Sequence, residues 1–360
     1  MTIEPDDTDA EILAPDVDRE LKRLGASDDE IRLAREHNLV ALLAAVHAAM
    51  PAEPKYVSGE LSERVGVDDA IAKRLWRAMG FADAGEGERI FTDADAEVLA
   101  VAHASIAAGI TTVDESVQMT RVIASSMARI AEAMVSSTMA DADMPTPEAE
   151  AMFALTVESI FDTYSKLIDY VWRRHLQAVL RRQLLATLEQ GEQGSTYAVG
   201  FADLVGFTAL SQELSPAELA GVVTRFEDLA FDHVARHGGR VAKVIGDEVM
   251  FVVRDTAAAV ETGLDLAEAY ADDEVLSDVR VGIACGDVLA HEGDYYGPVV
   301  NLASRIVNIA VPGSVVVSPS VRETLGDDDG RYVFHGLRPR QLKDIGRVRL
   351  WRVRRGHPSR

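Results

Sequence analysis

The chain has 360 residues, of which 48% are hydrophobic and 26% are charged, and its 36 Lys and Arg residues against 59 Asp and Glu residues give a net charge of −23. This composition is that of a folded globular protein and excludes disorder throughout. The large negative charge argues against a general binder of nucleic acid or of anionic membranes, because neutralising phosphates requires excess cationic charge.

Length and cysteine content bound the organisation further. At roughly 100 to 200 residues per domain, the chain is long enough for two domains, each with its own core. The single cysteine, Cys285, can form neither an intramolecular disulfide nor a cysteine metal cluster. The acidic amino terminus has no signal-peptide pattern, and the longest apolar run, residues 39–50, is too short to span a bilayer. We therefore expect a cytoplasmic protein that does not enter a membrane.

The first half of the chain, from about residue 16 to residue 188, is rich in Ala, Leu, Glu and Arg, with apolar residues three and four positions apart. This spacing predicts consecutive helices. Pro and Gly interrupt the helical pattern at residues 51–54, 80–87, 110–112 and 145–147. We expect an all-α domain over residues 1–190.

A helix-turn-helix rhythm occurs within this half, at residues 61–81, followed by a short GERIFT stretch that would form a wing. Asp68 and Asp69 at the start of the second helix would repel phosphates, whereas Lys73, Arg74 and Arg77 follow them. We do not expect nucleic acid as a partner, but DNA binding by this segment stays open as an alternative.

The last helical segment, residues 148–189, is expected to form one long helix or two. Its second part, at about residues 164–189, has an apolar residue at every fourth position beside a basic cluster. The apolar residues are Ile168, Trp172, Leu176, Leu180, Leu184 and Leu188, and the basic ones are Arg173, Arg174, Arg181 and Arg182. One interpretation is a helix that faces the core; the other is a connecting helix that transmits movement to the next domain.

The second half, residues 191–360, has a different pattern after the linker GEQGS. Segments rich in Val, Ile and aromatic residues predict strands at residues 196–207, 240–253, 279–290, 313–318 and 348–353. Amphipathic helical patterns lie between them, at residues 216–237, 256–271 and 300–311. This alternation predicts an α/β or α+β domain with one main sheet.

Two acidic residues stand where predicted strands end. Asp203 lies in FADLVGFT, and Asp247 lies in KVIGDEVMF at a turn between two strands. Gly206 would let the chain approach a phosphate, and the backbone amides that follow, at Phe207 and Thr208, would point at it. Two carboxylates beside a triphosphate would hold one or two Mg²⁺ ions. An aspartate at a hairpin tip is also an ordinary turn former, so each motif alone has a structural alternative.

A second group of polar residues surrounds this pair in the sequence. Lys243 precedes Asp247 by four residues, and Asp294 opens the segment DYYGPVVNLASR. Asn301 and Arg305 in that segment are four residues apart and share one face of a predicted helix. An amide and a guanidinium would point into the same cleft; the alternative is a solvated helix face.

In this order and spacing, FADLVGFT, KVIGDEVMF and DYYGPVVNLASR resemble the signature segments of class III nucleotidyl cyclases, over about residues 196–355. The resemblance implies a ferredoxin-like α+β catalytic domain that cyclises ATP or GTP, with release of pyrophosphate, by a two-metal mechanism with Mg²⁺ or Mn²⁺. It implies a homodimer, because in the family the metal pair and the base-reading pair face each other across a dimer interface.

The same resemblance implies a role for each matching residue. Asp203 and Asp247 would bind the metals; Lys243 and Asp294 would read the base; Asn301 would position the ribose; Arg305 would stabilise charge on the reacting phosphate; and Gly206, Phe207, Thr208 and Lys343, the last in QLKDIG, would contact the substrate. No position of the family pattern is missing.

Hydrogen bonding predicts the base. Adenine has a donor at N6 and an acceptor at N1, whereas guanine has an acceptor at O6 and a donor at N1. The Asp294 carboxylate only accepts and the Lys243 ammonium only donates, so the pair complements adenine. ATP is therefore the predicted substrate. A guanylate cyclase and a non-enzymatic interaction module stay open as alternatives.

The helical half resembles the regulatory domain that precedes some soluble actinobacterial adenylate cyclases. The resemblance implies regulation, and we expect this half to hold an inactive arrangement. Its input could be a small molecule, a lipid, a partner or protonation of a histidine such as His103, His175, His233 or His237.

Overall fold

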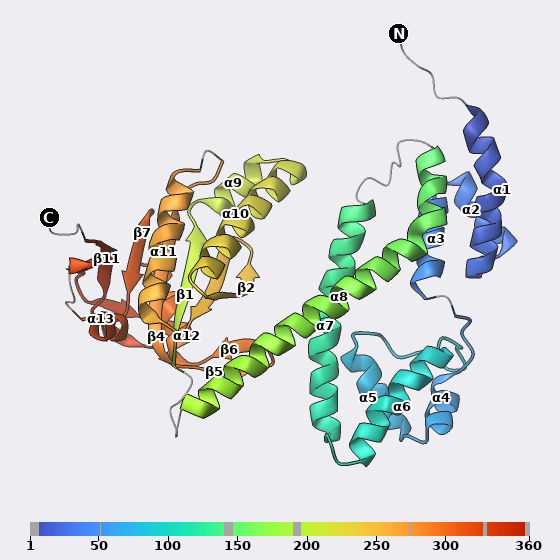
Figure 1. The fold of residues 1–360 in the computed structure, drawn as a ribbon, viewed down its shortest axis with the longest axis horizontal. Helices are drawn as coiled ribbons and strands as arrows, with labels where there is room; N and C mark the ends of the chain where they lie inside the picture. The colour runs from blue at the N-terminus through green and yellow to red at the C-terminus, as the bar shows by residue number, and fades with distance from the viewer. Residues whose placement is uncertain are drawn as a thin grey trace, which may run out of the picture. The chain divides into compact units, whose positions relative to one another are not determined.

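The computed structural model describes residues 7–50, 52–139, 147–189, 196–273, 275–326 and 330–356. The chain divides into two compact units, Met1–Leu188 and Glu189–Arg360. Figure 1 shows that the first contains only helices and that the second is built on a sheet. Among the described residues, no helix is both long and apolar enough to cross a membrane.

The described part of the first unit is all-helical, as the sequence predicts. Its helices are α1 (Asp7–Leu24), α2 (Asp28–Glu36), α3 (Val40–Ala49), α4 (Ser58–Val65), α5 (Asp69–Ala78), α6 (Asp93–Ala107), α7 (Val113–Met139) and α8 (Pro147–Glu189). One hydrophobic cluster joins α1, α2 and α3 to the start of α8, and a second joins α4, α5 and α6 to the start of α7. The expected breaks at residues 80–87 and 110–112 fall between helices, as do residues 52–54, and Pro147 begins α8; residue 51 and residues 145–146 lie outside the described part of the chain.

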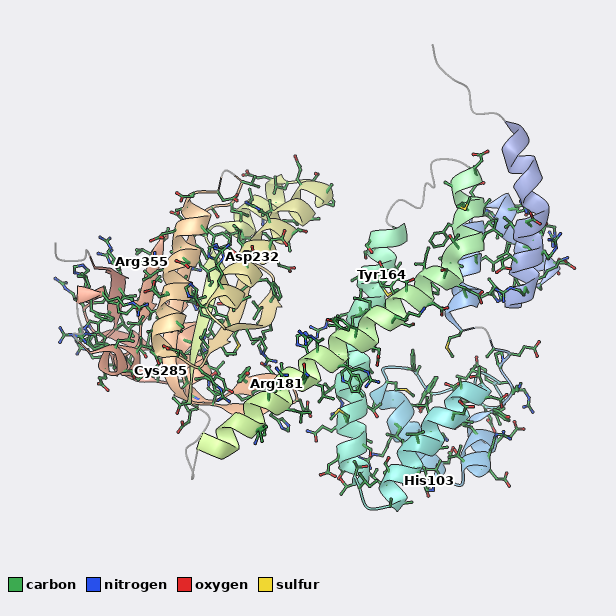
Figure 2. All side chains as sticks on the ribbon, in the orientation of Figure 1. His103, Tyr164, Arg181, Asp232, Cys285 and Arg355 are labelled. Atoms are coloured by element: carbon green, nitrogen blue, oxygen red, sulfur yellow. The ribbon has the colours of Figure 1, made fainter. Side chains whose placement is uncertain are left out.

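The second part of α8 does not lie in a core. Residues 148–189 belong to one continuous helix, and its apolar residues Trp172, Leu180 and Leu184 are 56%, 58% and 60% exposed. Figure 2 labels Arg181 on the same part of the helix. The interpretation of this stripe as core-facing is therefore not confirmed within the described residues. The side chains of Arg182 and Leu188 lie outside that description.

The predicted helix-turn-helix is present as α4 and α5. Gly66 ends α4 with φ of 77°, a left-handed conformation that favours glycine, and Tyr56 pairs with Phe91 beside the two helices. Each cation of α5 is paired with a carboxylate of the same unit. The pairs are Lys73–Asp69 at 2.6 Å, Arg74–Asp114 at 2.7 Å and Arg77–Asp83 at 2.5 Å. Contact with DNA phosphates would have to compete with all three.

The second unit is an α+β domain, which confirms the predicted fold class. Its strands are β1 (Thr196–Leu204), β2 (Arg240–Ile245), β3 (Glu248–Val253), β4 (Val279–Asp287), β5 (Leu289–His291), β6 (Asp294–Tyr296), β7 (Ser314–Val317), β8 (Tyr332–Gly336), β9 (Arg340–Leu342), β10 (Gly346–Val348) and β11 (Trp351–Arg355). Its helices are α9 (Phe207–Glu213), α10 (Pro216–Arg236), α11 (Thr256–Ala271), α12 (Pro298–Val307) and α13 (Pro319–Leu325).

Seven strands form the main sheet in the order β2-β3-β1-β4-β7-β11-β8, and β5–β6 and β9–β10 form two small hairpins. The ladders of the main sheet are antiparallel except for β4–β7. Cores lie on both faces. Phe226 of α10 and Leu266 of α11 pack on one face, where Figure 1 shows both helices, and Ile306 of α12 packs on the other.

Two local predictions differ from the structure. The sequence predicts one strand over residues 348–353, but β10 ends at Val348 and β11 begins at Trp351. The last predicted helix is shifted, because α12 starts at Pro298, whose fixed φ suits a first helical position. Strands of three residues carry too little pattern to be recognised in a sequence.

Candidate active site

The two aspartates at the ends of strands lie close together in the fold. Asp203 is the penultimate residue of β1, and Asp247 lies in the turn between β2 and β3. The backbone amide of Leu204 donates to the carbonyl oxygen of Asp247 at 3.0 Å, so the end of β1 is bonded directly to this turn. Gly246 precedes Asp247 with φ of 62°, and this left-handed position is one that glycine adopts without strain.

Arg280 and Glu248 join this pair. In the sheet register, Asp203 lies opposite Glu248 of β3 on one side and opposite Arg280 of β4 on the other. Opposite residues in a ladder share a face, so the three side chains form one row. Arg280 Nε donates to Asp203 Oδ2 at 2.6 Å. With Asp247, the group contains three carboxylates and one guanidinium.

Burial and crowding of negative charge shift the pKa values of this group. Burial raises the pKa of Asp203, and the ion pair with Arg280 offsets only part of that effect. Burial, followed by the charges of Asp203 and Asp247, raises the pKa of Glu248 to about 7. The row is therefore an environment in which additional positive charge is favourable.

The donor set fits a divalent cation that shares its coordination with a substrate. No group of three or more His, Cys, Asp and Glu side chains in the described residues is arranged to hold a metal by itself. Asp203, whose side chain is 15% exposed, and the neighbouring Asp247 can supply two carboxylates. Mg²⁺ and Mn²⁺ are hard cations that accept such a partial set and complete it with phosphate oxygens and water.

A second ion pair lies on β2 and β6. Lys243 Nζ donates to Asp294 Oδ2 at 2.5 Å, and the backbone amide of Tyr295 donates to Asp294 Oδ1 at 2.7 Å. Burial alone would raise the pKa of Asp294, but these hydrogen bonds hold it below its ordinary value. The pair presents a fixed anion beside a fixed cation, with both side chains partly exposed.

The remaining predicted residues occupy three places. Asn301 and Arg305 lie on the same face of α12, four residues apart. Gly206, with φ of 77°, leads directly into Phe207 and Thr208 at the start of α9. Lys343 is exposed in the turn between β9 and β10, and none of the contacts among the described residues joins it to the Asp203–Asp247 pair or to the Lys243–Asp294 pair.

Comparison with known proteins decides the family. Residues 190–352 match the adenylate and guanylate cyclase catalytic domain, and residues 15–184 match the adenylate cyclase regulatory domain. An adenylate cyclase of Streptomyces coelicolor is 37% identical over 76% of this chain and 72% of its own. A pH-sensitive adenylate cyclase of Mycobacterium tuberculosis is 34% identical over 92% of this chain and 85% of its own. The chain belongs to the adenylate cyclase family.

One solved structure with a similar fold is the adenylyl cyclase CyaB of P. aeruginosa, which is 23% identical over 46% of this chain and 96% of that chain, with a TM-score of 0.40. The family membership confirms that the chain is a class III cyclase, hence an enzyme, and that its helical half is of the regulatory type.

Sequence reasoning about this cyclase overlooked Arg280 and Glu248. Glu248 directly follows Asp247 and has the pattern of an ordinary strand residue. Arg280 lies 77 residues from its partner Asp203, and only the sheet register brings the two together. One signal was available: Arg280 is a single cation in the otherwise apolar run VRVGIAC, where burial of a charge requires a partner.

Proposed function

We propose that this cyclase converts ATP to 3′,5′-cyclic AMP and pyrophosphate. The observation that carries the proposal is the Lys243–Asp294 ion pair, with Nζ to Oδ2 at 2.5 Å. Held side by side, an acceptor and a donor match N6 and N1 of adenine. Guanine would place an acceptor against Asp294 and a donor against Lys243, at a cost of about 1–3 kcal/mol for each mismatched buried group.

Asp203 and Asp247 would hold divalent cations, Mg²⁺ or Mn²⁺ and two per site. When bound, such cations lower the pKa of the ribose 3′-hydroxyl and neutralise charge on the triphosphate. In the reaction the 3′-oxygen bonds to the α-phosphorus, the bond from that phosphorus to the bridging oxygen of pyrophosphate breaks, and the 3′-hydroxyl proton is released to solvent.

The protein side chains act by orientation and charge. Asn301 would hold the ribose, and Arg305 on the same helix face would stabilise negative charge on the reacting phosphate. Backbone amides after Gly206 and the ammonium of Lys343 would hold the phosphates. No nucleophilic side chain is required, because positioning and electrostatic stabilisation carry phosphoryl transfer.

We also propose that the sites are shared across a homodimer, with the metal pair of one protomer opposite the base-reading pair of its partner. Exposed apolar side chains around the two pairs support an interface here: Ile245 is 54% exposed, Leu289 62% and Tyr296 46%. Apolar groups gathered beside polar functional residues are typical of a surface that a partner covers.

Regulation is the proposed role of residues 1–190, with residues 191–360 as the catalytic domain. A site divided between two protomers is sensitive to small rotations of one against the other. The second part of α8 is our candidate for transmitting such a rotation, with an input that is a small molecule, a lipid or a proton.

The test is turnover of purified protein with ATP and with GTP, in Mg²⁺ and in Mn²⁺. We expect cyclic AMP as the main product. The double variant Lys243→Glu and Asp294→Asn presents an acceptor to guanine N1 and a donor to guanine O6, so ATP turnover should fall at least tenfold relative to GTP turnover. Asp203→Asn is the matched control, which should reduce turnover of both nucleotides alike.

The alternatives predict other results. A wild-type preference for GTP would indicate a guanylate cyclase. No cyclic product with either nucleotide or metal would indicate an interaction module and would remove the proposal.

A further inference from the structure

The hairpin that carries Asp294 is not part of the main sheet. Its strands β5 and β6 pair with each other and with no other strand of the described chain. They are joined at Glu292 and Gly293, which have φ of 53° and 81°, as in a tight two-residue turn. The chain holds the hairpin at its base, between β4 and α12, but no backbone ladder fixes its turn against β2, so the position of the turn depends on side-chain contacts.

Arg240 makes two of these contacts, one on each side of Asp294. Its Nη2 donates to the carbonyl oxygen of Gly293 at 3.2 Å. Its guanidinium lies 5.2 Å from the centre of the Tyr295 ring, within the range of a cation–π contact. The Tyr295 ring in turn packs against Tyr197 of β1, with ring centres 5.4 Å apart. The residues before and after Asp294 are thus held by one cation.

A β-bulge in β2 makes this arrangement possible. Side chains alternate between faces along a regular strand, so positions 240 and 243 would point to opposite faces. In β2 the register shifts before Lys243, so that Arg240 lies opposite Val252 and Lys243 opposite Met250. Val252 and Met250 belong to one buried cluster on one face of the sheet. The bulge therefore brings both cations to the face where the hairpin lies.

We propose that Arg240 is a positioning residue for adenine recognition. By fixing the hairpin turn and the adjacent ring, it keeps the Asp294 carboxylate within reach of both Lys243 and the purine. The proposal rests on the proposed ATP cyclase function, which it deepens. Arg240 does not contact the base; it acts through Asp294. Without Arg240, the Asp294 carboxylate that selects adenine would occupy several positions.

The test compares Arg240→Ala and Arg240→Lys with the wild-type full-length protein. In Arg240→Ala, the KM for ATP should rise about fivefold to tenfold while kcat stays within about twofold, because recognition of the base is equal in the ground and transition states. The ratio of kcat/KM for ATP to that for GTP should fall by a similar factor. Arg240→Lys should recover part of both, because it keeps a cation beside Tyr295.

Arg254→Ala is the matched control. The Arg254 guanidinium lies 5.6 Å from the centre of the Tyr197 ring, in the same aromatic group but one ring further from Asp294. Its removal should leave the KM and the nucleotide ratio unchanged. An equal effect of Arg254→Ala would overturn the proposal, since it would assign the effect to the ring cluster as a whole.

Two further outcomes would also overturn it. One is Arg240→Ala with unchanged KM and nucleotide ratio; the other is a loss of kcat alone with a lowered melting temperature, the signature of a structural role. If the wild-type protein forms no cyclic AMP, the proposed function fails instead. Binding of fluorescent ATP and GTP analogues to wild type and Arg240→Ala then tests the positioning role directly, with loss of adenine preference as the expected result.

Discussion

Glu248, Asp203 and Arg280 lie side by side on β3, β1 and β4. In this partly buried row, one guanidinium faces two carboxylates, so the negative charge is only partly neutralised. Arg280 bonds to Asp203, at 2.6 Å between Nε and Oδ2, while Asp247 adds another carboxylate nearby. The excess negative charge and the burial raise the pKa values of Asp203 and Glu248. When both groups are ionised, the folded protein without metal is therefore less stable. If the row holds cations as proposed, it gives up some stability of the metal-free protein in order to do so.

Glu248→Gln should stabilise the metal-free protein at pH 8. The unfolded chain releases the Glu248 proton near the ordinary glutamate pKa of 4.5, whereas the folded protein keeps it up to a pKa of about 7. Stability is therefore lost as pH rises through this window, and above it the loss is complete. Allowing for screening by water, the variant should gain about 1–2 kcal/mol at pH 8 and almost nothing at about pH 4. Urea denaturation in a chelating buffer measures the gain.

Glu261→Gln is the matched control, with the opposite sign. Glu261 accepts hydrogen bonds from Arg331, Tyr332 and Arg355, the last labelled in Figure 2, and these bonds hold its pKa below the ordinary value despite burial. Its contribution is present above the unfolded pKa and is lost as pH falls. The variant should therefore destabilise at pH 8; a gain in both variants would contradict the assignment.

At this scale the sequence located the polar motif residues but not their partners. Asp203, Asp247, Lys243 and Asp294 lie in continuous segments that a reader of the sequence can see. The pairing of Arg280 with Asp203 can be recognised only when β1 and β4 are aligned, because strand register is set by the whole sheet.

Helix α12 depends on one glycine of β4 for its position. An added Cβ at Gly282 would lie 2.3 Å from the backbone nitrogen of Val307 and 2.9 Å from the carbonyl oxygen of Ala303. The helix therefore rests directly on the strand backbone, and the same helix carries Asn301 and Arg305. Close packing of α12 on β4 therefore fixes the backbone positions of Asn301 and Arg305.

Gly282→Ala should reduce both turnover and stability. The new methyl group forces α12 away from β4, at about 1–3 kcal/mol for overpacking. A displacement of about 1 Å at Asn301 and Arg305 would lower kcat roughly tenfold to a hundredfold. Gly221→Ala in α10, where an added Cβ meets nothing within 4 Å, is the control and should stabilise by about 0.5–1 kcal/mol. Steady-state kinetics and thermal denaturation of both variants separate the two effects.

Most long elements were predictable because their ends carry local signals. Ser215 and Glu218 form a capping box at the start of α10, and Asp255 caps α11, so both helices begin where the pattern indicated. The β5–β6 hairpin and the bulge before Lys243 have no such signal. Both depend on pairing between strands, which local spacing does not encode.

The whole molecule joins a helical unit, which matches the regulatory-domain family, to a cyclase unit that has its own cores on both faces of its sheet. Deleting residues 1–190 should therefore leave a folded catalytic unit. If the helical unit holds an inactive arrangement, turnover per protein should rise severalfold, because the constraint on the shared site is removed. Turnover should be compared at equal dimer concentration, measured by light scattering. Unchanged turnover would contradict autoinhibition.

A site shared between two protomers makes a prediction that no single-chain site can make. In the proposed site, Asp203→Asn would remove a carboxylate of the metal pair, and Asn301→Ala would remove the ribose contact, which lies with the base-reading pair of the partner, so each variant alone should be inactive. In an equal mixture, half of the dimers contain one chain of each kind, and each of these has one intact site and one that carries both defects. Activity should therefore recover to about a quarter of the wild-type value. Mixing either variant with itself at the same total concentration is the control. Because recovery requires that the two altered groups belong to different halves of one site, a mixture that stays inactive while exchanging subunits would show that each protomer contains a complete site.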